Sequence, residues 1–119
     1  MSEVMVWLRG RLPPETIVTN GAGPGVMAAD RAAEMDVALP DLSPQTLQAL
    51  NAALPAHWSH GNPVDILGDA GPARYQQAVS LCLSDPGIDG VLVMLTPQAM
   101  TRPLAAAEAT IEASEASDK

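Results

Sequence analysis

The 119-residue sequence has no phenylalanine, one cysteine and only six basic residues. With Trp7, Trp58 and Tyr75 as its sole aromatic residues, a core must be built mainly from aliphatic side chains and alanine. A lone cysteine, Cys82, excludes an internal disulfide, suits a reducing compartment and is predicted to pack in the core. Six Lys and Arg against fourteen Asp and Glu disfavour a surface that binds nucleic acid or anionic membranes.

Long apolar runs are also missing. No stretch approaches the roughly twenty residues of a membrane-spanning helix, and the start, Met1-Ser2-Glu3, lacks the basic character of a signal peptide. We therefore expect a soluble, cytoplasmic chain with one domain and a modest core. Its expected organisation is a poorly defined N-terminal segment over residues 1–15, a domain over 16–113 and a polar tail over 114–119.

The most informative stretch begins with a β-branched run at residues 16–19, which is followed by Asn20-Gly21-Ala22-Gly23-Pro24-Gly25 and an alanine-rich pattern. This order predicts a strand, a tight turn and a helix, with the glycines visiting positive φ or allowing a close approach of the backbone. The spacing is not that of the dinucleotide-binding fingerprint, and no Walker lysine follows. The glycines either shape a corner only or contact a ligand, and the residues alone leave both readings open.

Further elements follow from periodicity and from the placement of proline. Helices are predicted at about 24–35, 44–54, 72–83 and 103–113, and strands at 16–19, 37–39 and 90–95, while 62–72 repeats the strand-turn-helix signal. Residues 3–12 form either an edge strand or a helical turn. The predicted inward faces of the four helices are, in chain order, Val26, Ala29 and Ala33; Leu47, Leu50 and Leu54; Tyr75, Ala78, Val79 and Cys82; and Leu104, Ala107 and Ile111.

Alternation of strands and helices predicts an α/β fold: an open parallel sheet in three layers, with ligands outside the carboxyl ends of the strands. Both glycine-rich turns should lie at that end. With only three convincing strands, the sheet is expected to leave an open edge beside the 90–95 strand, which more chain or a partner would cover.

Two histidines, His57 and His60, flank Trp58 in a predicted loop. A His-x-x-His pair is the start of a metal site, but no third histidine or nearby cysteine completes one and Asp65 is a poor substitute, so we predict surface histidines and no metal. A phosphoacceptor receiver domain is disfavoured, because no acidic pair follows a first strand and the only lysine is the terminal Lys119.

Three motifs in order, together with Tyr75, resemble the NDP-forming acyl-CoA synthetases, which include ADP-forming acetate-CoA ligases. The motifs are residues 17–26 (IVTNGAGPGV), 62–70 (NPVDILGDA) and 85–93 (DPGIDGVLV). The same architecture is known from the synthetase-like region of protein lysine acetyltransferases and, more distantly, from succinyl-CoA ligase. The resemblance covers residues 17–102 and implies a flavodoxin-like, succinyl-CoA ligase-type domain, here truncated to three or four strands.

The resemblance also implies a function. The complete enzymes join a carboxylic acid to CoA with ATP and Mg, through an acyl phosphate and a phosphohistidine, using separate CoA-binding and ATP-grasp domains. The matching domain faces the phosphohistidine with helix N-termini and helps to bind the acyl group. Carried over to this chain, the residues that bind substrate or phosphate are Asn20, Gly21, Gly23, Asn62, Gly68, Asp69 and Ala70.

The chain departs from the family pattern in what it omits. Trp58-Ser59-His60-Gly61 does not match the phosphohistidine segment, and no ATP-grasp or CoA-binding sequence is present. No catalytic residue and no cofactor are therefore expected in this chain, which is predicted to be part of an acid-CoA ligase and inactive alone. The alternative is a non-catalytic interaction or ligand-sensing module, as in the acetyltransferases.

Overall fold

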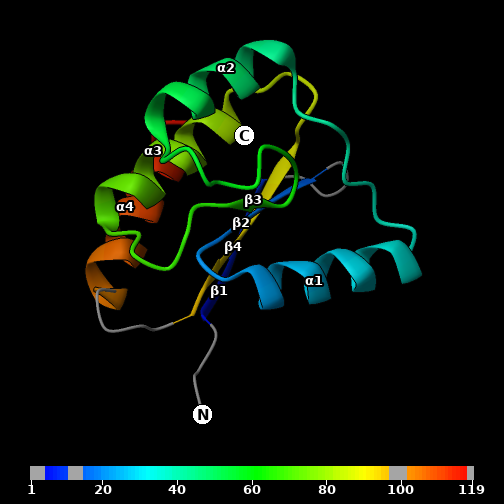
Figure 1. Cartoon of the computed structure of the whole chain (residues 1–119), viewed down its shortest axis with the longest axis horizontal. Helices are drawn as coiled ribbons and strands as arrows, with labels where there is room; N and C mark the ends of the chain where they lie inside the picture. The colour runs from blue at the N-terminus through cyan, green and yellow to red at the C-terminus, as the bar shows by residue number, and fades with distance from the viewer. Residues whose placement is uncertain (1–4, 11–14, 97–101, 118–119) are drawn as a thin grey trace.

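A computed structural model describes residues 5–10, 15–96 and 102–117 (Figure 1). The elements within these residues are β1 (Met5–Gly10), β2 (Glu15–Thr19), α1 (Ala22–Glu34), α2 (Pro44–Ala53), β3 (Val64–Asp65), α3 (Pro72–Leu83), β4 (Gly90–Leu95) and α4 (Pro103–Glu115). Residues 96–98 are predicted to end the last strand; of these, residues 97 and 98 lie outside the described residues. None of the helices in the described part of the chain is long and apolar enough to span a membrane.

The four strands form one sheet in the order β1-β4-β2-β3. Strand β2 pairs in parallel with both β3 and β4, which confirms the α/β class and the parallel core of the sheet. Strand β1 is antiparallel to β4, with Met5 opposite Leu95 and Gly10 opposite Gly90. The segment 1–15 thus contains a strand, which decides between the two readings of residues 3–12.

The expected open edge beside residues 90–95 is therefore wrong. Strand β4 is an interior strand, because β1 pairs with one of its edges and β2 with the other. A chain segment distant in sequence supplies the missing partner. Pairing on both edges satisfies the backbone polar groups of a strand whose Val91, Val93 and Leu95 are buried.

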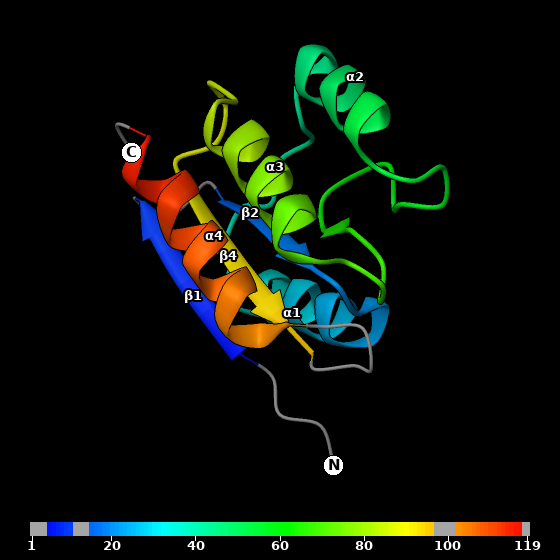
Figure 2. The same cartoon turned by 90° about the vertical axis from the view of Figure 1, so that its left-hand side faces the viewer.

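Helix α1 covers one face of the sheet, and α3 and α4 cover the other, with α2 beside α3 (Figures 1 and 2). This arrangement gives the three predicted layers. Every residue of the predicted inward face of α3 is buried, and Leu50 and Leu54 of α2 are buried with Leu47 packed against the core. Ser43 caps α2 by accepting a hydrogen bond from the Thr46 amide, as its position before Pro44 predicts.

Of the residues predicted to form the inward faces of α1 and α4, only Ala107 is buried. Val26 is 57% exposed, whereas α1 buries Gly25 and Ala32. Helix α4 turns Leu104 and Ile111 outward and buries a set of small side chains, namely Ala106, Ala107, Ala109, Thr110 and Ala113. Small side chains let a helix lie close against its neighbour. In α1 and α4 the buried face is therefore the one with the small residues, and the larger apolar side chains point outward.

Three boundaries also differ from prediction. Residues 37–39 form no strand; Asp36 turns the chain with φ of 57°, and residues 37–43 connect α1 to α2 without regular structure. Helix α1 starts at Ala22, two residues earlier than predicted. Helix α4 continues to Glu115, so the first two residues of the expected tail are helical.

Candidate functional site

Both glycine-rich turns lie where the strands of the sheet have their carboxyl ends, as predicted. Strands β2 and β3 are parallel neighbours whose last residues, Thr19 and Asp65, face each other. The Ile66 amide then donates a 2.8 Å hydrogen bond to the Thr19 carbonyl, which ties the start of the second turn to the end of β2. The chain therefore leaves the sheet twice at adjacent points.

A cavity of about 120 Å³ lies at this end of the sheet, between the first turn of α1 and the ends of β2 and β3. Its wall is completed by the segment that precedes β3. The lining residues are Thr19, Ala22, Gly25, Val26, Ser59, Pro63 and Asp65.

Helix α1 begins over this cavity. Its N-cap, Gly21, has φ of −133°, donates its amide hydrogen to Thr19 Oγ1 at 3.0 Å, and accepts the first helical hydrogen bond from Gly25 at 3.1 Å. The amides of Ala22 and Gly23 precede that first intrahelical bond, and both residues are exposed. The turn therefore presents two N–H groups where the helix dipole is positive.

Positive φ does not explain these glycines, contrary to the prediction. Gly21 is extended, and neither Gly23 nor Gly25 has a left-handed backbone. Close approach does explain Gly25, because a Cβ there would lie 2.8 Å from Thr19 Cγ2. A Cβ at Gly23 would meet no atom within 4 Å.

The two predicted asparagines bond to the protein backbone. Asn20 is buried; its Oδ1 accepts from the Thr96 amide at 2.7 Å and its Nδ2 donates to the Thr96 carbonyl at 2.8 Å. Asn62 Oδ1 accepts from the Ile17 amide at 3.1 Å, and its Nδ2 donates to the Pro40 carbonyl at 3.1 Å. Asn20 thus joins the end of β2 to the end of β4, and Asn62 extends the pairing of the very short β3.

In the second turn, Asp69 is exposed and pairs with Arg74 at 2.6 Å. The hydrogen bond from Arg74, and then its charge, lower the pKa of Asp69. Ala70 is fully buried, and its amide donates to the Leu67 carbonyl at 3.2 Å. Gly68, the residue before them, is half-buried. Among the residues predicted to bind substrate or phosphate, only Gly23 has its amide in the first turn of a helix, where it has no partner within the helix.

The sequence did not single out the cavity wall formed by Ser59 and Pro63. Ser59 Oγ donates to the Pro63 carbonyl at 2.6 Å and accepts from the Asp65 amide at 2.8 Å. These contacts fold residues 59–65 back on themselves beside α1. Serine and proline in a polar loop carry no signal for such a position.

Both histidines are on the surface, as predicted. Among the residues the structure describes, no group of three or more His, Cys, Asp or Glu is arranged to hold a metal ion.

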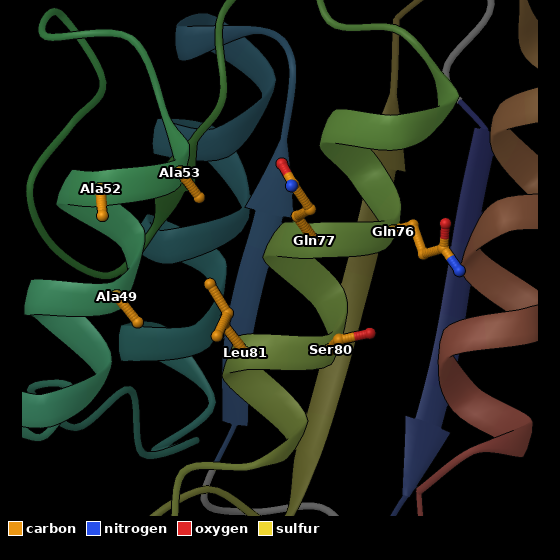
Figure 3. A pocket seen from close by; sticks show the side chains of 7 residues that line it. All are labelled: Ala49, Ala52, Ala53, Gln76, Gln77, Ser80 and Leu81. Carbon is orange, nitrogen blue, oxygen red and sulfur yellow. The ribbon is translucent and has the colours of Figure 1, made fainter.

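A second, larger cavity of about 610 Å³ runs between α2 and α3 (Figure 3). Alanines of α2 face Leu81 and Gln77 of α3 across it, whereas Gln76 points toward α4. Its lining is neutral and carries no metal ligand or nucleophile other than a serine hydroxyl. The residues are Ala49, Ala52, Ala53, Gln76, Gln77, Ser80 and Leu81.

Comparison with known proteins gives a consistent picture. A family model described as "Ligase-CoA domain" matches residues 15–118. Acetate–CoA ligase (ADP-forming) I of Archaeoglobus fulgidus is 42% identical over 95 residues, which cover 80% of this chain and 14% of that protein. The alpha subunit of acetate–CoA ligase (ADP-forming) I of Pyrococcus furiosus is 35% identical over 95 residues, covering 80% and 20%.

Among solved structures, the dinucleotide forming acetyl-coenzyme A synthetase 1 of Ca. Korarchaeum cryptofilum, in complex with phosphate and ADP, superposes with a TM-score of 0.77 at 27% identity. The match covers 90% of this chain and 24% of that one. This chain thus spans less than a quarter of the length of each of these relatives.

Proposed function

This chain belongs to the Ligase-CoA domain family, and we propose that it supplies a phosphate- and acyl-binding helix N-terminus to an ADP-forming acid–CoA ligase. Such an enzyme converts a carboxylic acid, CoA and ATP into acyl-CoA, ADP and phosphate. The names of the relatives support the reaction class, and this chain's small share of their length supports a division of labour. We assign the CoA-binding and ATP-grasp functions, Mg and the phosphorylated histidine to other domains or subunits.

One observation carries the proposal: the exposed residues Ala22 and Gly23 begin α1 at the carboxyl end of the sheet, where Ala22 lines a cavity. Phosphate and carboxylate oxygens accept hydrogen bonds from the amides at a helix start, and the helix dipole adds roughly half a positive charge there. The cavity of about 120 Å³ has room for a phosphoryl or acetyl group. Asn20 and Asn62 act indirectly in this proposal, by holding the strand ends that carry the turn.

Asp65 places a negative charge close to the proposed anion site. Asp65 is one of the residues that line the cavity, and its Oδ1 accepts a hydrogen bond from the Leu67 amide at 2.9 Å. A negative charge this close opposes a second anion. Binding of a dianion is therefore weaker than the amides alone would give, and Asp65→Asn should bind inorganic phosphate more tightly than the wild type.

The test is a titration of the full chain with inorganic phosphate and with acetyl phosphate, followed by amide NMR resonances. We expect the Ala22 and Gly23 amides to shift most. Ala22→Pro removes one donor at the first helical position, where proline is accepted, and should weaken binding. Gly23→Ala, which keeps both amides, is the matched control. Shifts spread over the whole surface, or equal affinity in the two variants, would contradict the proposal.

The interaction-module alternative has one observation in its favour. Val26 and Met27 are 57% and 73% exposed in the second turn of α1, beside the cavity. Exposed apolar side chains at such a place suit contact with another protein surface. Self-association in light scattering, lost in the Met27→Lys variant and combined with no response to phosphate, would favour this reading.

A further inference from the structure

His60 is held between two hydrogen-bond acceptors. Its Nδ1 lies 3.0 Å from Asn51 Oδ1, and its Nε2 lies 2.8 Å from the Ala56 carbonyl oxygen. The orientation of the Asn51 amide is not arbitrary, because Oδ1 also accepts the indole hydrogen of Trp58 at 2.9 Å. A flipped amide would point its NH₂ group at that indole N–H.

A neutral imidazole has one N–H donor and one lone pair, so it satisfies only one of these two acceptors. The doubly protonated ring donates to both. We propose that protonation of His60 closes a brace, formed by Asn51, Ala56, Trp58 and His60, that fixes one wall of the cavity beside α1.

Two residues of the brace are adjacent in sequence to a residue that lines the cavity. Trp58 is 2% exposed and anchors the segment between α2 and β3, which Figure 2 shows projecting beyond the end of α2. Ser59 lies between the two ring residues of the brace and lines the cavity together with Pro63. Loss of one His60 hydrogen bond therefore loosens the residue that forms the wall.

Few charges surround His60. Helix α2 contains no charged residue, and the segment 54–63 contains no titratable side chain besides the exposed His57 and His60. Asp65 follows this segment in β3. Both ion pairs of the described residues join Arg to Asp or Glu and lie elsewhere. The contacts that the structure shows at the His60 ring are therefore hydrogen bonds and not an ion pair.

The indole N–H resonance of Trp58 reports the brace directly, because Trp58 and His60 share the Asn51 oxygen. We expect this resonance to move when the sample is taken from a pH at which histidine side chains are neutral to one at which they are protonated. His60→Asn should abolish the movement; asparagine tolerates the left-handed backbone of this residue, where φ is 58°. His57→Asn is the matched control and should leave the movement intact.

A second variant tests the contact itself. Asn51→Asp keeps an acceptor for both rings and adds a negative charge, so the midpoint of the Trp58 movement should rise to higher pH. A resonance that does not move in the wild type, that still moves in His60→Asn, or whose midpoint is unchanged in Asn51→Asp would overturn the proposal. These measurements need no ligand, so their outcome is independent of what the cavity binds.

Discussion

At the scale of single residues, Gly25 and Gly23 differ in whether the structure has room for a side chain. Gly25→Ala would place a Cβ 2.8 Å from Thr19 Cγ2, and Thr19 cannot rotate away without losing its Oγ1 contact with Gly21. We expect the free energy of unfolding to fall by about 1–3 kcal/mol, as for other overpacked sites. Urea denaturation measures the change.

Gly23→Ala is the control for that experiment. The new methyl group meets no atom within 4 Å, and alanine favours a helix over glycine by about 0.5–1 kcal/mol. The variant should be as stable as the wild type or slightly more so. Equal losses at both positions would show that α1 does not pack on β2 as described.

Tyr75 is a buried residue whose hydroxyl group forms hydrogen bonds. Its hydroxyl donates to the Met94 carbonyl at 3.1 Å, and burial raises its pKa well above the usual range, an effect that a hydrogen bond from the backbone N–H of Asn20 partly offsets. Tyr75→Phe leaves both backbone groups without this partner and should cost about 1–3 kcal/mol of unfolding free energy. Ser114→Ala, at a hydroxyl bonded on the surface of α4, should cost far less in the same urea assay.

At the scale of elements, α4 packs against α3, and the side chains that α4 buries are small. Ala109 is buried, whereas Leu104 is 74% exposed. We expect Ala109→Leu to lower the free energy of unfolding by about 1–3 kcal/mol, because the added atoms force the helices apart. Leu104→Ala should change it by less than about 0.5 kcal/mol. If Leu104→Ala lowered the free energy of unfolding more than Ala109→Leu in urea denaturation, the result would support the inward face that periodicity predicts, with Leu104 buried.

Asp85 connects the end of α3 to the start of α2. Burial by itself raises the pKa of this carboxyl, but hydrogen bonds from the amides of Ser43 and Gly87, both at 2.8 Å, outweigh burial and hold the pKa below its usual value. A carboxyl whose pKa is lowered by folding stabilises the fold above its unfolded pKa of about 3.9. That contribution is lost as pH falls through the lower folded value.

The pH dependence of stability tests this link. The wild type should lose stability steeply below about pH 4. Asp85→Asn should be less stable near neutral pH, and its stability should fall less steeply over the same acid range. Urea denaturation at a series of pH values measures both curves; parallel curves would mean that Asp85 is not held in this way.

At the scale of the whole molecule, the size of the site limits the chemistry. The cavity beside α1 measures about 120 Å³, below the roughly 300–1,000 Å³ typical of small-molecule sites. The cavity of about 610 Å³ between α2 and α3 is large enough, but its lining has no charged group to bind the phosphates of a nucleotide or of CoA. We predict that the purified chain forms no acetyl-CoA from acetate, ATP and CoA. An assay for acyl-CoA checks this, and product that co-purifies with the chain would overturn the assignment of the other steps to other domains.

The fold was predictable where its signals are local. Helices α2 and α3 begin at prolines that follow a suitable cap, and β4 is a continuous apolar run, so their bounds came close to prediction. The strand-turn-helix signals also placed the two turns at one edge, because parallel strands must end together. The segment that became β1 was ambiguous, since a short apolar run suits a strand or a helical turn.

The candidate site was predictable in its location but not in its working residues. Asn20 and Asn62 stood out as polar residues in the motifs, but their partners Thr96 and Ile17 are 76 and 45 residues away. No local pattern shows that a side chain is already bonded over such a distance. Ser59 and Asp65 were not assigned to the site, because they line the cavity only once β3 pairs with β2, far away in the sequence.

The sequence by itself determined the starts of α2, α3 and α4, the glycine-rich turns and the family, because each depends on residues close together or in a fixed order. Only the tertiary structure decided that β1 runs antiparallel beside β4, that α1 and α4 bury their small residues, and that Gly25 is the glycine in close contact. Those outcomes depend on which surfaces meet, and contacts between distant segments are set by packing of the whole chain.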